Sequence, residues 1–437
     1  MSNKMFTLKY MLIIAIFSLT TFAYIFAETY SDSKYVPGSV KLYENGNTKE
    51  AILMYPTTID EIPCKADYVS FYESGKLKSC TLSMDIPEYN VSGNSIVKLY
   101  ENGHLESCKI SKTLNINELP VKADYVSFYN DGKFKSGNLA EKMFIGDYPC
   151  SDDYFELYND GKLKSCVLSK SMIIEEYPVK ASVVTFYNDG KLNSFSLYKT
   201  TDINTNKFPA DTYISLDEDS VLKEASLKQV AQIQNIYIKV NTKMTFYKSG
   251  KLSAFTSSQN ININGYDCKA GEPITQYENG TLKSCYLLNQ MIVYGFPCKA
   301  TLITFYENGR PNSFYLSDEV KIQKYPCQTN TEVTLYEDGK IKSCYLGDDS
   351  YIQGQKFFSK TYIYFFNNGY IQKCKLFEPN VINGIYCKAG DIEYYDNGQL
   401  KSCILFKPKT INSYTYYENE QVCFNQKGEL IDCNKIK

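Results

Sequence analysis

One ten-residue phrase recurs along almost the whole of this 437-residue chain. Copies read FYESGKLKSC from Phe71, LYNDGKLKSC from Leu157, FYNDGKLNSF from Phe186 and YYDNGQLKSC from Tyr394. The glycine of each phrase, or the serine that replaces it once, recurs at intervals of 28, 29 or 30 residues. Such a tight period predicts a repeat array of about fourteen units instead of two or three unrelated domains.

Each phrase predicts a β-hairpin, because alternating aromatic and aliphatic residues flank an Asn-Gly, Asp-Gly or Ser-Gly turn. A two-residue loop would set Phe71 opposite Lys78. A three-residue loop with Gly75 as a left-handed bulge residue sets Phe71 opposite Leu77, which keeps the apolar residues on one face and is therefore favoured. The corresponding turn glycines are Gly75, Gly103, Gly132, Gly161, Gly190, Gly250, Gly280, Gly309, Gly339, Gly369 and Gly398.

A third apolar segment, such as EYPVKAS from Glu176, precedes each phrase, so each unit has room for three short strands and little helix. We therefore predict an all-β fold. Its units form an elongated antiparallel meander built on hairpins, with a closed β-solenoid as the alternative.

The stretch from 200 to 242 is the irregular part of the array, because Ser220 stands where the other copies have glycine. Residues 220–234 could form a short helix, but the preserved spacing favours a worn repeat. We expect its turn to be looser or of another type. The predicted organisation is a signal peptide (1–27), an N-terminal repeat half (35–199), a degenerate junction (200–242) and a C-terminal repeat half (243–437).

The N-terminus has the pattern of an export signal, with Lys4 and Lys9 before an uncharged, largely apolar stretch over residues 10–27. We expect its removal and a secreted, periplasmic or cell-surface protein; a retained membrane anchor is the alternative. Without residues 1–27 the net charge is about −4, from 45 Lys and Arg against 49 Asp and Glu. This balance, with a single arginine (Arg310), argues against a nucleic-acid partner.

Fifteen cysteines in an exported chain suggest disulfides. Most candidate cysteines fall at two fixed places in the repeat, eleven or twelve residues before the turn glycine and five after it: Cys64 and Cys80, Cys150 and Cys166, Cys268 and Cys285, Cys327 and Cys344, Cys387 and Cys403. The last copy offers Cys423 and Cys433 as a further candidate pair. In a flat meander these strands would lie two apart, roughly 9.6 Å at ~4.8 Å per strand, beyond the ~7 Å reach of a disulfide. Bridges within a repeat would thus favour a solenoid, and apolar filling is the alternative role.

Tyrosine is the other repeated side chain, since it occupies the position three residues before most turn glycines. The candidate binding surface consists of Tyr72, Tyr129, Tyr158, Tyr187, Tyr247, Tyr306, Tyr336 and Tyr395. Such a row offers broad contact area with a polar tip, suited to many weak contacts with a protein or glycan. The alternative is that it packs against lysines and merely covers the sheet.

Catalytic, cofactor and metal motifs are not recognisable in the sequence. His104 is the only histidine, and no Cys-x-x-Cys or glycine-rich nucleotide loop occurs. The expected function is therefore non-catalytic, with no cofactor and no metal. We expect an exported binding array, or alternatively an envelope-associated spacer or fibre without a specific ligand.

The phrase YENGKLKS, as approximated in many copies, resembles the MORN-type repeat, in the short variant found in exported bacterial proteins. The resemblance covers about ten residues of each copy between Val40 and Cys433. It implies an array of β-hairpins, and the family name also suggests membrane-lipid or protein contact. These units are longer than MORN units and lack some of their glycines, so only the hairpin array is carried over.

Overall fold

The computed structural model describes residues 34–86, 90–411 and 414–433. The predicted signal segment, residues 1–27, lies outside these ranges. The chain divides into two compact units, Met1–Tyr198 and Lys199–Lys437. The described residues contain strands and turns and no α-helix, so the all-β prediction is confirmed.

Unit 1 contains six long hairpins joined edge to edge as an antiparallel meander. They are β1 (Lys41–Leu42) with β2 (Thr48–Ile52), β4 (Ile62–Phe71) with β5 (Leu77–Leu82), β6 (Ile96–Leu99) with β7 (Leu105–Lys109), β10 (Tyr125–Phe128) with β11 (Phe134–Asn138), β13 (Tyr148–Leu157) with β14 (Leu163–Leu168), and β17 (Val183–Phe186) with β18 (Leu192–Ser196).

Unit 2 continues the pattern with eight long hairpins in an open meander. They are β21 (Tyr213–Leu216) with β22 (Leu222–Ser226), β25 (Lys243–Phe246) with β26 (Leu252–Thr256), β29 (Pro273–Gln276) with β30 (Leu282–Tyr286), β33 (Leu302–Phe305) with β34 (Pro311–Tyr315), β37 (Glu332–Leu335) with β38 (Ile341–Tyr345), β41 (Tyr362–Phe365) with β42 (Ile371–Leu376), β45 (Gly390–Tyr394) with β46 (Leu400–Ile404), and β49 (Gln421–Phe424) with β50 (Leu430–Ile431). The sheet is thus an open antiparallel meander, as predicted, and does not close into the alternative β-solenoid.

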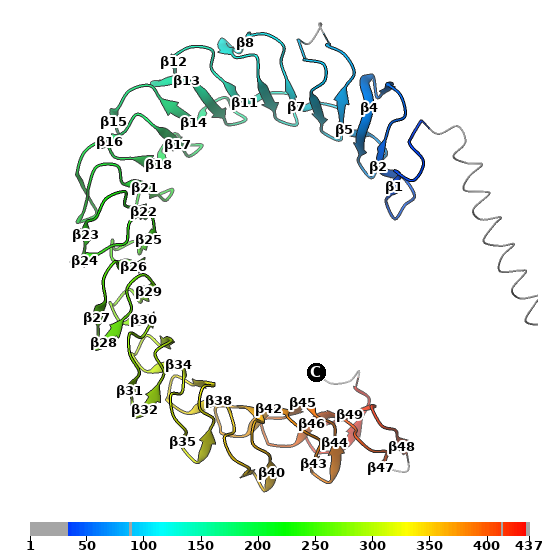
Figure 1. The fold of residues 1–437 in the computed structure, drawn as a ribbon, viewed down its shortest axis with the longest axis vertical. Helices are drawn as coiled ribbons and strands as arrows, with labels where there is room; N and C mark the ends of the chain where they lie inside the picture. Colours follow the sequence, from blue (N-terminus) through cyan, green and yellow to red (C-terminus); the bar gives the residue numbers. More distant parts are fainter. Residues whose placement is uncertain (1–33, 87–89, 412–413, 434–437) are drawn as a thin grey trace, which may run out of the picture. The chain divides into compact units, whose positions relative to one another are not determined.

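A row of short hairpins lies behind the long ones and closes the core in each unit. In Figure 1, β31 and β32 line one side of unit 2 and β29 and β30 the other. In unit 1 the short hairpins are β3 (Thr57–Ile59) with the start of β4, β8 (Leu114–Ile116) with β9 (Leu119–Val121), β12 (Met143–Ile145) with the start of β13, and β15 (Met172–Ile174) with β16 (Tyr177–Val179). The third apolar segment of each repeat supplies their second strand.

The short hairpins of unit 2 follow the same plan. They are β19 (Thr201–Ile203) with β20 (Asn206–Phe208), β23 (Gln232–Ile233) with β24 (Ile236–Tyr237), β27 (Ile261–Ile263) with β28 (Tyr266–Cys268), β31 (Met291–Val293) with β32 (Phe296–Cys298), β35 (Val320–Ile322) with β36 (Tyr325–Cys327), β39 (Ser350–Ile352) with β40 (Gln355–Phe357), β43 (Asn380–Ile382) with β44 (Ile385–Cys387), and β47 (Lys409–Ile411) with β48 (Tyr414–Tyr416). A typical repeat therefore has four strands, one more than predicted.

The bulged turn predicted for the long hairpins is confirmed. Phe71 pairs with Leu77, and the register shifts between Ser70 and Phe71. The Tyr72 amide donates to the Lys76 carbonyl at 2.8 Å, and Gly75 has a φ of +86°. Because only glycine enters this region without strain, the repeated turn glycine is a backbone requirement.

The repeat at Ser220 corrects one expectation. Its turn is of the same type as the others, since the Asp217 amide donates to the Val221 carbonyl at 2.8 Å and Ser220 has a φ of +62°. Residues 220–234 contribute to strands β22 and β23 and not to a helix. The Asp217 carboxylate accepts from the amides of Asp219 and Val221, which holds the turn without glycine.

The core lies between the inner face of the long hairpins and the short hairpins. In the first complete copy Val69, Phe71 and Leu77 point inward and are at most 4% exposed, and they face Ile59 and Cys64 of the short hairpin. Strand residues thus alternate between this inner face and an outer face that points away from the short hairpins. The outer face carries the predicted binding residues.

Candidate binding surface

The outer face is ordered into three rows of side chains, one position from each long hairpin. Nearest the turn is the tyrosine row, made by the tyrosines three residues before the turn glycine. Next comes the hydroxyl row, made by Ser and Thr at the middle of the hairpin. Farthest from the turn is the distal row, made by exposed apolar and tyrosine side chains at the hairpin base.

The tyrosine row links each hairpin to the next. Its hydroxyls donate to a backbone carbonyl 27 to 29 residues further along, at 2.6 to 3.0 Å. The pairs are Tyr43 to Phe71, Tyr72 to Leu99, Tyr100 to Phe128, Tyr129 to Leu157, Tyr158 to Phe186, Tyr247 to Gln276, Tyr277 to Phe305, Tyr306 to Leu335, Tyr336 to Phe365 and Tyr395 to Phe424. These bonds occupy the polar tips that would otherwise meet a ligand.

Lysines cover the rings of the same row. The Lys78 ammonium lies 5.4 Å from the Tyr72 ring centroid, and Lys135 and Lys342 repeat the contact over Tyr129 and Tyr336 at 5.5 Å. Contacts at this distance are cation–π interactions, worth about 0.5–1 kcal/mol at exposed sites. The tyrosine row is therefore half-buried between its lysine and the next hairpin.

Partial burial also affects the ionisation of the row. Desolvation raises the pKa of Tyr72, Tyr247 and Tyr336 above the ordinary phenol value. Their hydroxyls stay neutral donors at physiological pH. The row is suited to holding hairpins together and less suited to ligand contact than the sequence suggested.

The hydroxyl row forms short side-chain pairs across seven of the long hairpins, while charged residues such as Lys98, Glu156 and Glu224 hold the same position in others. The oxygen–oxygen distances are 2.6 to 2.9 Å for Ser70–Ser79, Ser127–Ser136, Thr185–Ser194, Thr245–Ser253, Thr275–Ser284, Thr304–Ser313 and Thr334–Ser343. Each hydroxyl has one proton and two lone pairs, so a bonded pair still presents acceptor capacity to the outer face. The row is small in volume and forms the floor between the two larger rows.

The distal row carries exposed apolar and tyrosine side chains on the outer face, and sequence reasoning missed it. Its exposed members are Ile52, Tyr68, Ile96, Tyr125, Tyr154 and Val183 in unit 1, and Tyr213, Leu302, Tyr315, Tyr345 and Ile404 in unit 2. Their exposed fractions lie between 38% and 58%. Each lies next to a buried residue of its own strand, as Tyr68 does before Val69 and Tyr315 after Phe314, a spacing that alternation alone could have identified.

Neighbouring turns are joined by a second set of contacts. The Asn102 amide donates to the Asn130 carbonyl of the next turn at 2.9 Å, and the Lys162 ammonium donates to the Asn188 carbonyl at 3.0 Å. The Asp160 carboxylate accepts a hydrogen bond from the Lys162 backbone amide, which lowers the pKa of Asp160. Charged and polar turn residues thus have structural partners.

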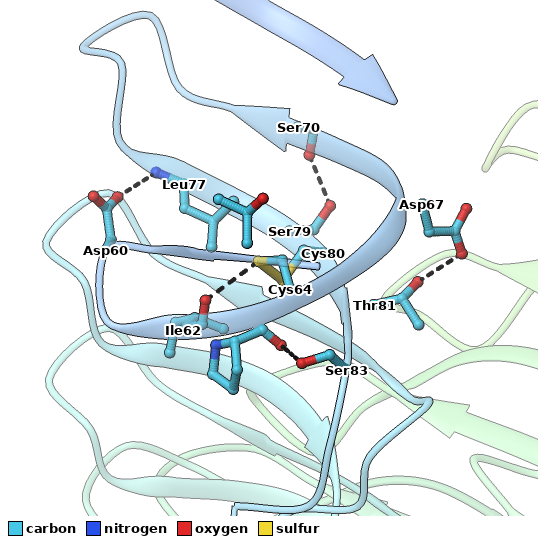
Figure 2. The surroundings of a disulfide bond; sticks show 12 residues. Asp60, Ile62, Cys64, Asp67, Ser70, Leu77, Ser79, Cys80, Thr81 and Ser83 are labelled. Atoms are coloured by element: carbon cyan, nitrogen blue, oxygen red, sulfur yellow. Dashed lines mark hydrogen bonds between the residues drawn. A yellow bond between two sulfur atoms is a disulfide. The ribbon is translucent and has the colours of Figure 1, made fainter. Parts of the chain in front are cut away.

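Two disulfides, Cys64–Cys80 and Cys150–Cys166, join the two core layers, as Figure 2 shows for Cys64 and Cys80, and a third, Cys423–Cys433, lies at the last long hairpin. The Cα–Cα distances are 5.7 Å for Cys64–Cys80, 6.0 Å for Cys150–Cys166 and 5.2 Å for Cys423–Cys433. The expected separation of roughly 9.6 Å was wrong, because the short hairpin lies behind the long one and not beside it. Bridges therefore form in an open meander and do not require a solenoid.

The other three candidate pairs, Cys268–Cys285, Cys327–Cys344 and Cys387–Cys403, are buried thiols in the same two layers. The Cys387 thiol donates to the Cys403 sulfur at 2.7 Å. Burial also raises the pKa of Cys108 to about 11 and that of Cys298 to about 12. Neutral, buried thiols are poor nucleophiles, so these side chains act as core residues.

A cleft interrupts the outer face of unit 2 over β41–β46. It has a volume of about 610 Å³ and is lined by Tyr364, Phe366, Gln372, Lys373, Glu393, Tyr394, Tyr395, Asp396, Lys401 and Gln426. Within the described ranges no three His, Cys, Asp or Glu side chains gather closely enough to hold a metal ion. No helix in those ranges is long and apolar enough to cross a membrane.

Comparison with known proteins gives distant structural likenesses only. No protein-family profile and no curated protein matches the chain. The crystal structure of TcdB2-TccC3 is 10% identical over 88% of this chain, with a TM-score of 0.13, and this chain spans 23% of that one. A porin-like protein from Bacteroides uniformis is 10% identical over 56% of this chain and 90% of its own, with a TM-score of 0.12. The MORN resemblance therefore rests on the motif alone.

Proposed function

We propose that this protein is an exported, non-catalytic repeat array whose outer face binds an extended protein or glycan ligand, with a glycan favoured. The observation that carries the proposal is the distal row, which sets exposed tyrosine and aliphatic side chains beside the paired Ser and Thr hydroxyls of the hydroxyl row. The tyrosine row supports this surface by holding successive hairpins in register.

A glycan suits the chemistry of these rows. Sugar hydroxyls both donate and accept, as do the Ser and Thr hydroxyls of the floor. Flat aromatic side chains such as Tyr125 and Tyr154 offer an apolar face for the C–H face of a sugar ring and a polar tip for its hydroxyls. Both side chains are about half exposed, at 53% and 47%.

The repeat also suits a polymer. Each repeat adds two long strands to the sheet, which is roughly 9.6 Å along the sheet at ~4.8 Å per strand. The same contacts are therefore offered at regular steps along a ligand. Individually weak contacts become strong together when one chain engages several of them.

The test is the binding of the labelled full chain to an immobilised glycan array. Replacing Tyr125 and Tyr154 by serine should reduce the signal at least tenfold. The matched control replaces Phe144 and Ile173, which lie on short hairpins and are exposed by 59% and 52%, and should leave binding unchanged. Equal loss in both variants, or binding that neither variant alters, would overturn the outer-face proposal.

If the protein binds no glycan and no peptide, the spacer alternative is favoured instead. Turn-to-turn contacts of the kind made by Asn102 and Lys162 would then have a mechanical role only.

A further inference from the structure

The cleft over β41–β46 lies where one repeat departs from the pattern of the tyrosine row and of the hydroxyl row. Phe366 replaces the row tyrosine, so it has no hydroxyl to donate to the next hairpin. By the spacing of its neighbours, the carbonyl it would reach belongs to Tyr394. Both residues line the cleft, which opens at the position of this missing link.

The hydroxyl row is also replaced at this point. Tyr364 pairs with Lys373 in the position held by Thr334 and Ser343 one repeat earlier, and Lys373 pairs in turn with Glu393. Three long side chains therefore stand side by side in the hydroxyl row, whereas single long side chains such as Glu156 or Glu224 interrupt it elsewhere. Tyr364, Lys373 and Glu393 all line the cleft.

The charges of the cleft balance. Lys373 and Lys401 supply two positive charges, and Glu393 and Asp396 supply two negative charges. Lys401 pairs with Glu393 at 3.4 Å, and the Lys373 ammonium lies 5.4 Å from the Tyr364 ring centroid. A charged ligand gains little from a lining with no net charge, whereas a neutral polyol can use both the donors and the acceptors.

The remaining lining residues are aromatic or amide. Phe366 and Tyr395 are half-buried and offer ring surface, while the amides of Gln372 and Gln426 each donate and accept. A volume of about 610 Å³ lies within the range of small-molecule pockets, ~300–1,000 Å³.

We propose that this cleft binds a neutral saccharide of one or two sugar rings, stacked on aromatic side chains and hydrogen-bonded by the balanced charged and amide groups. The proposal deepens the proposed function and rests on it, since the cleft is part of the outer face. It differs in being confined to three neighbouring hairpins, β41–β42, β45–β46 and β49–β50, whereas the distal row runs along both halves of the array.

The test uses variants that restore the neighbouring pattern and should fold. Tyr364→Thr with Lys373→Ser recreates the Thr334–Ser343 pair, and Phe366→Tyr supplies the missing hydroxyl. The full chain is titrated with maltose, cellobiose and N,N′-diacetylchitobiose, followed by saturation-transfer NMR. We expect at least one to bind, and each repair to weaken it at least tenfold while thermal unfolding stays equal or moves upward.

A control variant, Tyr315→Ser, removes a distal-row side chain that does not line the cleft. Disaccharide binding should survive it. Binding lost in Tyr315→Ser but kept in both repairs would overturn the cleft assignment and leave the outer-face function standing. No disaccharide binding, or tighter binding of a glucuronic-acid disaccharide than of the neutral ones, would also overturn it. If the protein also binds no glycan on the immobilised array, the proposed glycan-binding function is wrong as well.

Discussion

A single hydroxyl in the tyrosine row tests whether that row is structural. Tyr336→Phe removes the 2.6 Å bond to the Phe365 carbonyl and keeps the ring under Lys342. A net intramolecular hydrogen bond contributes about 0.5–1.5 kcal/mol, and water can reach this half-buried site. We therefore expect a loss of about 1 kcal/mol between these two hairpins, which corresponds to about fivefold faster local opening.

Hydrogen exchange followed by mass spectrometry measures this opening locally. Peptides from β37–β38 and β41–β42 should exchange about fivefold faster, while distant hairpins should not change because an array couples mainly neighbours. Phe366→Tyr should produce the opposite change in β41–β46. Tyr351→Phe, on a side chain that is 77% exposed, is the control and should have no effect. Unchanged exchange in both row variants would refute the structural role.

Other predictions follow from the same geometry. Ser220→Gly should raise the unfolding midpoint, because Ser220 holds a left-handed conformation that costs about 1 kcal/mol; an unchanged or lower midpoint contradicts this. Gly161→Val should open its own hairpin, seen as faster exchange in β13–β14 only, and uniform loosening would be inconsistent with an array. Reduction should lower the melting temperature, and Cys64→Ala should remove part of that difference; equal shifts in both proteins would argue against the bridge. Desolvation raises the pKa of folded Tyr72 and similar tyrosines, so stability should fall as pH rises above about 10, where unfolded phenols lose protons; a flat profile up to pH 12 would contradict this.

Local patterns in the sequence were sufficient to predict the long hairpins. The turn glycine fixes a left-handed position, and alternation around Phe71 and Leu77 fixes which face is buried. Both are properties of ten consecutive residues. The register and the open meander followed from them.

The short hairpins were not predictable in the same way. Their two-residue turns use left-handed residues that are often not glycine, as at Glu175 and Glu176 with φ of 47° and 73°. At such turns the tertiary core imposes the conformation and the usual turn signal is absent, whereas Asn264-Gly265 and Asn383-Gly384 carry that signal and were not recognised. Missing this second layer also produced the wrong estimate of the cysteine separation.

The tyrosine row was recognised but its role was not. A tyrosine every 29 residues or so has the same sequence signature whether its hydroxyl meets a ligand or the next backbone. The deciding partners, such as Leu157 for Tyr129, lie one repeat away and depend on the register between hairpins. The distal row could have been predicted from alternation within one strand. Tyr125 and Val183 directly precede the buried residues Val126 and Val184, so alternation places them on the exposed face.

The most direct test of the outer face as an extended binding surface is the affinity for oligosaccharides of increasing length. The ladder is built on whichever saccharide the glycan array identifies, and titration calorimetry on the full chain measures each dissociation constant. Repeated contacts every two strands predict that the affinity keeps rising beyond the length that spans one repeat. An affinity that stops rising at that length, or no measurable affinity at any length, would contradict the account.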